Sequence, residues 1–334
     1  MESDMSKIIL GPMDGVAKYL PSDSVVIITD NNVRKYYGEK FPNAEIIEIE
    51  AGEEIKTLKT VESIYQQLLS LEADRSWFVL GIGGGVVTDI AGFVASTYMR
   101  GIEFGFIPTT FLAQVDASIG GKNGVNLRGY KNIIGTIRQP KFILCDTGLL
   151  KTLPKNEIKN GFVEVIKHAA IGNAKLFSLL EKNHETALLL DDNIIKKIVH
   201  DSIKVKTTIV KKDETEKLER MKLNFGHTIG HAIEKITHVP HGEAIAVGMV
   251  AECKLFSSMG LVKSEDTGRL ENLIKLYGLP TAIRCMKSDI AETIRKDKKR
   301  RNNNVILPVL NGIGKCRLVD IELNKLEAAI NDMC

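Results

Sequence analysis

The 334-residue chain has few cysteines, and they lie far apart. No two of the five form a Cys-x-x-Cys pair, and the number is odd. This argues against a disulfide framework and against a cysteine-based zinc site. We therefore expect a reducing, cytoplasmic compartment. The five positions are Cys145, Cys253, Cys285, Cys316 and Cys334.

The sequence also lacks long hydrophobic runs and a strong charge of one sign. No apolar run approaches the roughly 18 residues that cross a bilayer, so no membrane span is expected. The N-terminus has no long apolar core after a basic stretch, so no signal peptide is expected. The net charge of +3 is too small to indicate nucleic-acid binding, and no run interleaves basic and aromatic residues. With 44% hydrophobic and 26% charged residues, the chain is expected to be a soluble globular protein.

Short strand-like runs alternate with amphipathic segments in the first half of the chain. This alternation predicts a parallel sheet with helices on its faces, and hence a Rossmann-like α/β domain over residues 1–150. Longer helical patterns dominate afterwards and predict a mostly α-helical domain over residues 151–334. Strands are expected at 24–29, 77–80, 104–107, 142–145 and 304–307. Helices are expected at 57–71, 86–98, 155–171, 193–211, 227–235, 243–259 and 267–277.

A glycine-rich loop at residues 81–85 follows a predicted strand and precedes a predicted helix. Glycine lets a backbone approach a pyrophosphate closely, and a helix N-terminus favours anions. The loop departs from the Gly-x-Gly-x-x-Gly pattern at Val86, so a turn used only for packing stays open. Asp30, at the end of an earlier strand, is a candidate for a ribose hydroxyl or a simple turn residue.

Histidines at helical spacing suggest a metal site. His227 and His231 are four residues apart and would share a helix face, and His241 opens another helical run. Imidazole suits zinc, cobalt, nickel and iron, and catalytic zinc usually has three protein ligands. Spacing alone leaves open whether His227 or His231 is a ligand. Glu164, between apolar neighbours, is the best third ligand, although an ion pair with Lys167 would also explain a buried carboxylate there.

Cationic residues occur in glycine-interrupted segments between residues 98 and 135. Residues 119–124 are expected to form a tight loop whose backbone N–H groups, with Lys122, suit a phosphate group. Arg100 would add bidentate recognition. Scattered surface charge remains the alternative for each of these residues, including Lys131 and Asn132.

Together these segments resemble the 3-dehydroquinate synthase family of the sugar phosphate cyclase superfamily. The likeness extends over nearly the whole chain, and the combined motifs are far more specific than the glycine loop alone. The matching segments are 83–87, 91–101, 108–116, 120–122, 131–132, 152–154, 164–167, 223–231 and 241–244.

The resemblance implies a Rossmann-like domain, a helical domain and a lyase of the shikimate pathway, which leads to chorismate and aromatic amino acids. The implied reaction converts 3-deoxy-D-arabino-heptulosonate 7-phosphate to 3-dehydroquinate and phosphate. It proceeds by transient NAD-dependent oxidation, phosphate elimination, reduction and intramolecular aldol closure. The implied cofactors are NAD and one divalent metal, Zn²⁺ or Co²⁺. A homodimer is expected, with no nucleic-acid or membrane partner.

Three sets of site residues follow from the resemblance, position by position. The implied metal ligands are Glu164, His227 and His241. The implied substrate and catalytic residues are Arg100, Lys122, Lys131, Asn132, Lys167, Lys206, Arg220, Asn224, His231 and Lys298. The implied NAD-binding residues are Asp30, Glu53, Lys56, Gly84, Gly85, Asp89, Thr109, Thr110, Asp116, Lys122 and Lys131.

Two other enzyme classes share parts of this pattern. Another sugar phosphate cyclase, making an inosose or a valiolone, would keep NAD and metal but change the substrate pocket. An iron- or glycerol-type metal-dependent alcohol dehydrogenase would release NADH. A binding protein without catalysis is disfavoured by the complete charged set. The chain departs from the family at Thr88, usually glycine, at Asn123, usually threonine, and in a shortened segment over 234–241.

Overall fold

The computed structural model describes residues 5–21, 24–283 and 304–326. The chain divides into two compact units, Met1–Ile158 and Lys159–Cys334. The division falls inside helix α4 (Lys155–Gly172), a little after the border predicted from the sequence. Among the described residues, no helix has both the length and the apolar character needed to cross a bilayer.

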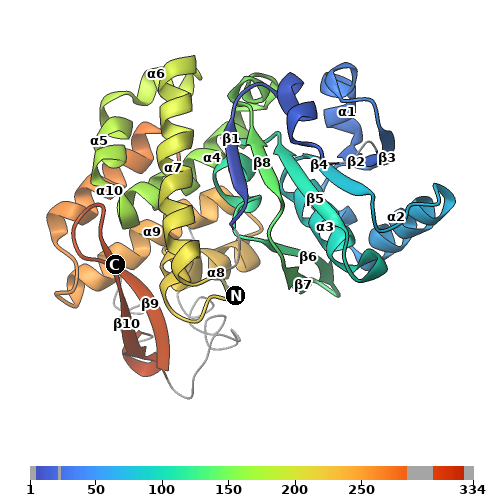
Figure 1. Cartoon of the computed structure of the whole chain (residues 1–334). Coiled ribbons are helices and arrows are strands. Elements are labelled where there is room, and N and C mark those ends of the chain that lie inside the picture. The colour runs from blue at the N-terminus through green and yellow to red at the C-terminus, as the bar shows by residue number, and fades with distance from the viewer. Residues whose placement is uncertain (1–4, 22–23, 284–303, 327–334) are drawn as a thin grey trace. The chain divides into compact units, whose positions relative to one another are not determined.

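The first unit is built on a parallel sheet of six strands (Figure 1). Its order is β1-β8-β5-β4-β2-β3, and every strand pair in it is parallel. The sequence analysis predicted four of these strands and missed the two at the edges, β1 and β3. The strands are β1 (Lys7–Leu10), β2 (Val25–Asp30), β3 (Glu45–Ile49), β4 (Phe78–Gly83), β5 (Glu103–Pro108) and β8 (Phe142–Cys145).

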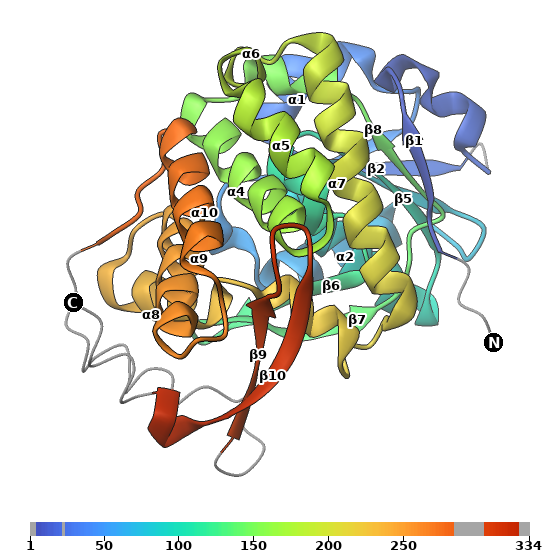
Figure 2. The ribbon, with the colours of Figure 1, turned by 90° about the vertical axis from the view of Figure 1, so that its left-hand side faces the viewer.

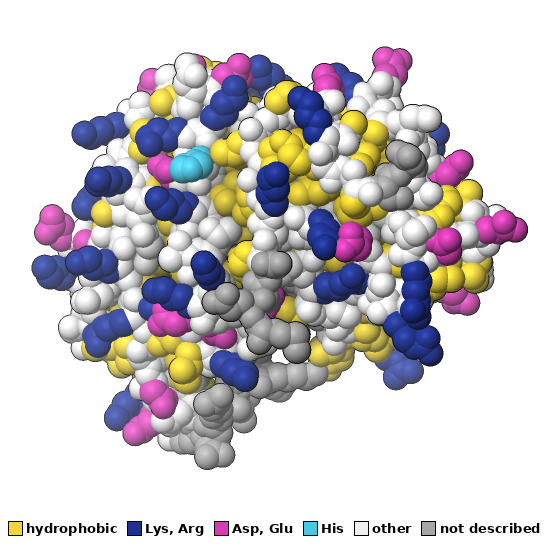
Figure 3. Space-filling view, in the orientation of Figure 1, with side chains coloured by type: hydrophobic (Ala, Val, Ile, Leu, Met, Phe, Trp, Pro, Cys, Tyr) yellow, Lys and Arg dark blue, Asp and Glu magenta, His cyan; other side chains and the backbone are white. Residues whose placement is uncertain are grey.

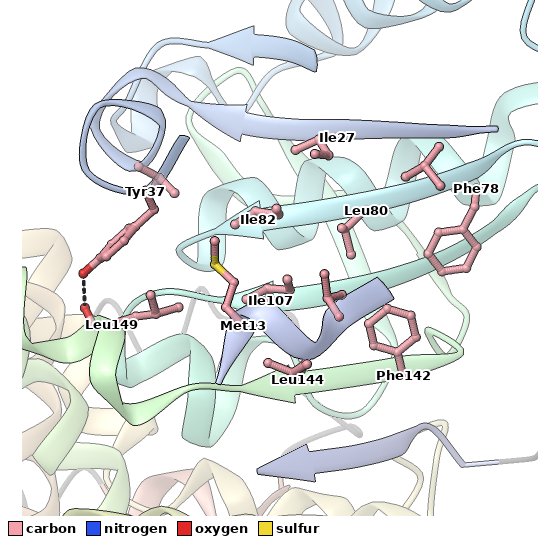
Figure 4. Packing of buried hydrophobic residues seen from close by; sticks show 13 residues of the cluster. Met13, Ile27, Tyr37, Phe78, Leu80, Ile82, Ile107, Phe142, Leu144 and Leu149 are labelled. Atoms are coloured by element: carbon pink, nitrogen blue, oxygen red, sulfur yellow. Dashed lines mark hydrogen bonds between the residues drawn. The ribbon is translucent and has the colours of Figure 1, made fainter. Parts of the chain in front are cut away.

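Helices cover the two faces of this sheet, as the alternation of side chains along β4 shows. Phe78, Leu80 and Ile82 point to one face and pack in a cluster with residues of η1 (Met13–Tyr19) and α1 (Asn31–Tyr37), as Figure 4 shows. Gly81 points to the opposite face, where a Cβ would lie 3.0 Å from the Cβ of Ala91. That face packs against α3 (Gly85–Thr97), while α2 (Leu58–Ser70) contacts β3. The predicted Rossmann-like fold is confirmed.

The order of the strands creates a switch point beside β2. Strand β3 pairs with one side of β2 and β4 with the other, so the chain runs from β2 out to β3 and then returns past β2 to β4. In open α/β sheets, ligands bind outside the carboxyl ends of the strands at such a point. Asp30 ends β2, and the glycine loop ends β4, so both lie at this edge of the sheet.

An antiparallel hairpin of β6 (Lys122–Leu127) and β7 (Tyr130–Ile137) corrects the loop predicted over residues 119–124. Only Gly120 and Gly121, with φ of 101° and 69°, make a turn, and Lys122 is already paired in β6. Gly124 serves a different purpose, since a Cβ there would lie 2.6 Å from the carbonyl oxygen of Ile134. A glycine inside a strand can mark close backbone approach rather than a turn. The sequence analysis therefore missed β6, because it interpreted Gly124 as part of a loop.

The second unit is mostly helical, and its long helices confirm the prediction from periodicity. The sequence analysis missed α5 and α6, which are short. The helices are α4, already given, α5 (Ala174–Lys182), α6 (His184–Leu188), α7 (Asp192–Lys212), α8 (His227–Thr237), α9 (His241–Ser258) and α10 (Ser264–Leu276). A short 3-10 helix, η7 (Glu219–Asn224), precedes α8.

A two-stranded hairpin of β9 (Asn304–Leu310) and β10 (Cys316–Glu322) completes the described part of the second unit (Figure 2). Its turn packs on the helices, where the N–H of Gly314 donates to the carbonyl of Ala170 at 2.8 Å. Only the first of these strands was predicted.

Charges on the molecular surface are mixed in sign. On the face drawn in Figure 3, Lys and Arg side chains are dispersed among Asp, Glu and uncharged residues. The chain has 45 Lys and Arg against 42 Asp and Glu, so neither sign dominates its composition.

Candidate active site

Three predicted ligand side chains meet in the second unit, each from a different helix. Glu164 lies in α4, while His227 and His241 are the first residues of α8 and α9. One ligand atom from each lies within 4.8 Å of the others, and His227 Nε2 is 3.8 Å from Glu164 Oε1. Two atoms bound to one zinc ion at 2.0–2.2 Å each would lie roughly 3–4 Å apart. The cluster therefore fits a single divalent ion after small side-chain adjustments.

Glu164 forms the ion pair with Lys167 that was the alternative interpretation of this residue, and metal binding by its other oxygen stays a prediction. Its Oε2 pairs with Lys167 Nζ one helical turn away, and both side chains are 2% exposed. Its Oε1 is the atom that faces His227. A buried carboxylate is stable only when its charge is compensated. Lys167 compensates one oxygen and leaves the other available to a cation.

Hydrogen bonds at Nδ1 orient both histidines of the cluster. His227 Nδ1 lies 3.2 Å from the Phe225 carbonyl, which can only accept, so Nδ1 carries the proton. His241 Nδ1 lies 2.9 Å from Glu234 Oε2. In both rings Nε2 is then the atom with a lone pair for a metal, as is usual for histidine ligands with an outer hydrogen-bond partner.

Glu234 is a functional candidate that the sequence analysis missed. It lies seven residues after His227 on α8, so it shares a face with His227 and His231. The short connection after α8 brings the chain back to Glu234. His238 adopts a left-handed conformation, and α9 begins directly after its N-cap residue Pro240. The shortened segment over 234–241 thus brings His241 against Glu234.

Burial keeps His227 in the form that binds metal. Burial lowers the pKa of His227 well below its usual value, and the positive charge of Lys167 and the neighbouring His231 and His241 lower it further. The imidazole is therefore neutral at neutral pH, and only a neutral imidazole can donate a lone pair. His231, one turn along α8, is exposed, with its ring centroid 5.1 Å from that of His227. The ligand atoms of His231, Glu234 and His241 also lie within 4.8 Å of one another.

Three buried cations belong to the same unit as the metal cluster. Lys167, Lys206 and Arg220 are 2%, 6% and 3% exposed. Because desolvating a cation is costly, such a set is suited to an anionic ligand. Arg220 Nη1 donates to the carbonyl of Glu214 at 2.7 Å, which fixes part of its guanidinium group.

Asn224, another predicted substrate residue, is held by a second acidic residue that the sequence analysis missed. Its Nδ2 donates to Glu216 Oε1 at 2.8 Å. Asp213 supports the same segment by accepting hydrogen bonds from the backbone N–H groups of Leu218 and Arg220 at 2.7 and 3.1 Å. Burial alone would raise the pKa of Asp213, but these and related backbone bonds hold it below its usual value. The site segment before α8 is therefore fixed by carboxylates.

In the first unit, a buried lysine joins residues from two predicted sets. Lys56 is 4% exposed, and its Nζ donates to Asp89 Oδ2 and to Asn132 Oδ1, both at 2.5 Å. Glu53 lies beside them and accepts from Asn126 Nδ2 at 2.8 Å. Residues expected to bind NAD and one expected to bind substrate are thus parts of a single network.

The glycine loop and the end of β5 form the other predicted cofactor cluster. The Thr109 N–H donates to the Gly83 carbonyl at 2.9 Å, and a Cβ on Gly84 would lie 2.9 Å from Thr110 Cγ2. Gly84 is the N-cap of α3 and supplies no side chain to its first N–H groups. These N–H groups can therefore bind an anionic group, as a pyrophosphate site requires.

Two acidic residues of the NAD set lie at or near this edge. Asp30 caps α1 by accepting the Val33 N–H at 2.9 Å, which is the turn role that the sequence analysis left open. Burial raises its pKa. Asp116 lies in η5 (Ala113–Ala117), the short helix that follows Thr110. Ribose binding by Asp30 stays a prediction.

The remaining predicted cations of the first unit are exposed. Lys122 and Lys131 lie on the β6–β7 hairpin, and Arg100 lies in the turn after α3. Met99 and Arg100 have φ of 48° and 67°, and two successive non-glycine residues in this region indicate a constrained turn. Lys298 lies outside the described residues.

The two substitutions among the departures from the family pattern, Thr88 and Asn123, are accommodated locally. Thr88 is 1% exposed, and its Oγ1 donates to the Gly85 carbonyl at 3.1 Å within α3. Asn123 Nδ2 donates to the carbonyls of Gly121 and Arg138 at 2.8 and 3.0 Å, which closes the base of the β6–β7 hairpin. Each substituted side chain therefore has a hydrogen-bond partner.

These features define a class of protein in which a Rossmann-like unit with an uncapped helix at its switch point precedes a helical unit with a Glu–His–His cluster. Sequence profiles identify the family within this class. The chain belongs to the 3-dehydroquinate synthase family, whose N-terminal profile matches residues 46–160 and whose C-terminal profile matches residues 161–300.

Curated relatives agree with the profiles. The chain is 43% identical over 321 residues to a 3-dehydroquinate synthase of Thermoanaerobacter pseudethanolicus, covering 92% of this chain and 90% of the relative. It is 41% identical over 318 residues to that of Saccharolobus solfataricus, covering 90% of each chain.

Solved structures show the same fold. A 2-deoxy-scyllo-inosose synthase complexed with carbaglucose-6-phosphate, NAD⁺ and Co²⁺ matches with a TM-score of 0.88 and 28% identity, covering 100% of this chain and 98% of the other. A 2-epi-5-epi-valiolone synthase from Streptomyces hygroscopicus, with NAD⁺ and Zn²⁺ bound, matches with a TM-score of 0.89 and 27% identity, covering 99% and 97%. A probable glycerol dehydrogenase from Sinorhizobium meliloti shares the fold at 16% identity, with a TM-score of 0.68 and coverage of 98% and 96%.

The cluster geometry predicts that His227→Ala weakens metal binding by more than the roughly 10–100-fold typical of losing an outer hydrogen-bond partner, because a direct ligand is removed. Metal content after dialysis and competition with a chromophoric chelator measure this. His200→Ala, at a side chain 60% exposed on α7, is the control and should bind metal normally. Unchanged metal affinity in the His227 variant would show that this imidazole is not a ligand.

Proposed function

We propose that this protein is a 3-dehydroquinate synthase, which converts 3-deoxy-D-arabino-heptulosonate 7-phosphate to 3-dehydroquinate and phosphate. The observation that supports this most directly is 41–43% identity to curated 3-dehydroquinate synthases over nine tenths of the chain. The Glu164–His227–His241 cluster and the buried cations of the same unit are the side chains that such a reaction requires. The proposal places the enzyme in the shikimate pathway.

We further propose NAD and one divalent ion, Zn²⁺ or Co²⁺, as cofactors. The uncapped start of α3 beside Thr110 suits a pyrophosphate, and the second unit offers one carboxylate and two imidazoles to the ion. When bound, the ion would polarise the substrate hydroxyl that is oxidised, and NAD would accept a hydride and return it. The two cyclases compared above carry NAD⁺ with Co²⁺ or Zn²⁺.

The residues of the first unit would hold the dinucleotide and the phosphate group. Lys56 would keep Asp89 and Asn132 in place, as its two hydrogen bonds show. Lys122, Lys131 and Arg100 would stabilise the phosphate as it leaves, by charge and by bidentate recognition. The proposed NAD-binding set is Asp30, Glu53, Lys56, Gly84, Gly85, Asp89, Thr109, Thr110, Asp116, Lys122 and Lys131.

The second unit would bind the rest of the substrate. Its carboxylate and hydroxyl groups suit the buried cations Lys167, Lys206 and Arg220. Asn224 follows Arg220 by four residues, and its side chain is held by a hydrogen bond to Glu216. His231, exposed next to the metal cluster, would relay a proton. We also keep Lys298 in the substrate set on the basis of the family resemblance.

The chemistry needs positioning and charge stabilisation more than many separate bases. With C5 at the ketone level, the proton on C6 is acidic, and its removal expels phosphate from C7 as the C–O bond breaks. The departing phosphate can itself take that proton. Ring opening and an aldol step then close the carbocycle after C5 is reduced again. Cations that stay fixed while negative charge moves to the phosphate lower the barrier without reorganising.

The alternatives have weaker support. The inosose and valiolone synthases are 27–28% identical to this chain, below the 41–43% of the curated 3-dehydroquinate synthases. The glycerol dehydrogenase shares only the fold. A dehydrogenase would also accumulate one NADH for each product molecule, whereas the proposed reaction returns the hydride.

We also propose a cytoplasmic homodimer. Tyr130, Ile133 and Ile137 on β7 are 61%, 46% and 48% exposed, and exposed apolar side chains of this kind often mark interfaces. Cys145 and Cys253 are buried free thiols, consistent with a reducing compartment.

Light scattering on the purified protein should give twice the chain mass of 36.9 kDa, and a monomeric mass at micromolar concentration would contradict the dimer.

The purified protein with NAD⁺ and Zn²⁺ or Co²⁺ should release phosphate from 3-deoxy-D-arabino-heptulosonate 7-phosphate without net NADH. Phosphate release and absorbance at the NADH band, followed in one cuvette, test this, and a chelator should abolish the release. Build-up of NADH equal to product would instead identify a dehydrogenase. Absence of release from this substrate, with turnover of a hexose or heptulose phosphate, would identify another cyclase.

Lys122→Ala should lower kcat/KM by roughly 100-fold or more, since removing one preorganised charge stabiliser commonly costs that much, and should leave metal content unchanged. Steady-state phosphate release and metal analysis on the same preparation measure both effects. Lys151→Ala, on the same unit but outside the proposed set, is the control. An unaltered kcat/KM would remove Lys122 from the phosphate site.

A further inference from the structure

Helix α9 contains a buried carboxylate that the proposed chemistry does not use. Glu252 is 1% exposed. Its Oε2 accepts the Gly226 N–H at 2.7 Å, and its Oε1 accepts the Ile229 N–H at 3.4 Å. Both donors belong to the start of α8, whose first residue is His227.

Helix α8 depends on this outside carboxylate because it has no cap of its own. Its N-cap residue is Gly226, which has no side chain to accept a hydrogen bond. The first N–H groups of a helix lack partners within the helix, and a negative charge there is favoured by the helix dipole. Glu252 supplies both an acceptor and a charge from the neighbouring helix.

Close packing explains why the cap comes from another helix. Gly226 has φ of +80°, and a Cβ there would lie 2.4 Å from Met249 Cγ. A Cβ on Gly248 would lie 2.1 Å from the Gly226 carbonyl oxygen. The two backbones therefore touch at this point, and a serine or aspartate cap at position 226 would not fit.

Helix α9 provides both a metal-ligand candidate, His241, and the residue that caps α8, Glu252. His241 is the first residue of α9, and Glu252 follows it by eleven residues, about three turns, so both lie on one face. A continuous helix thus presents His241 directly and holds the start of α8, with His227, through Glu252.

We propose that Glu252 is a positioning residue that fixes His227 relative to His241 and so sets the affinity of the Glu164–His227–His241 cluster for its divalent ion. The inference rests on the proposed metal-dependent function. The hydrogen bonds that Glu252 accepts from the backbone N–H groups of Gly226 and Ile229 would carry its effect to the ion through the position of His227.

A matched control separates positioning from ordinary capping. Asp191 caps α7 by the same chemistry, since its Oδ1 accepts the N–H groups of Asn193 and Ile194, both at 3.1 Å. Helix α7 contains no proposed metal ligand. Glu252→Gln, at a buried side chain, and Asp191→Asn, at an exposed one, each remove a capping charge at a helix start, and only the first of these starts bears on the cluster.

Zn²⁺ affinity, measured by competition with a chromophoric chelator, is the main measurement, together with urea unfolding of the metal-free proteins. Glu252→Gln should weaken Zn²⁺ binding by roughly 10–100-fold, as for other outer-sphere partners. Asp191→Asn should shift the urea midpoint and leave Zn²⁺ affinity within about 2-fold of wild type. Excess Zn²⁺ should restore the kcat of the Glu252 variant, because the ligands themselves remain.

Equal Zn²⁺ affinity in Glu252→Gln and wild type would overturn the proposal. If that variant does not fold, Glu252→Asp keeps the charge and withdraws it from the α8 N–H groups, and unchanged affinity there overturns it equally. Failure of the proposed function looks different, because wild-type protein would then bind Zn²⁺ but release no phosphate. The affinity comparison between the variants would stand in that case.

Discussion

The convergence of Glu164, His227 and His241 is the constraint on which the functional site depends. Each comes from a different helix, so their spacing is set by helix packing rather than by local sequence. Glycines make the approach possible. A Cβ on Gly242 would lie 2.4 Å from Asn160 Oδ1, and one on Gly248 would lie 2.1 Å from the Gly226 carbonyl. These two contacts bring α4 and α8 against α9, and the three ligand candidates with them.

Under the proposed function the two units would divide the chemistry between them, and each builds its share internally. In the first, an uncapped helix start at a sheet switch point and the Lys56 network provide for a dinucleotide and a phosphate. In the second, two imidazoles, a carboxylate and buried cations would provide for a metal ion and an anionic substrate. Such a division suits a reaction that moves a hydride and expels phosphate while needing few separate bases.

Hydrophobic periodicity was sufficient to predict the long elements and insufficient for the short or glycine-rich ones. Buried strands such as β8 and helices such as α4 were predicted nearly to the residue. The edge strands β1 and β3, and the hairpin that begins at Lys122, were missed. Short edge strands have little pattern, and the single glycine of β6, Gly124, permits close backbone approach where the sequence suggested a turn.

The sequence by itself determined the family, the fold class, the long helices and the types of residue at the site, because these follow from local patterning and from motifs that are contiguous in the chain. Only the tertiary structure decided which histidine faces Glu164, that Glu234 orients His241, and that Glu252 holds the start of α8. Such contacts join residues on facing helices or on either side of a turn. Their geometry depends on how two backbones pack, which single-sequence spacing does not specify.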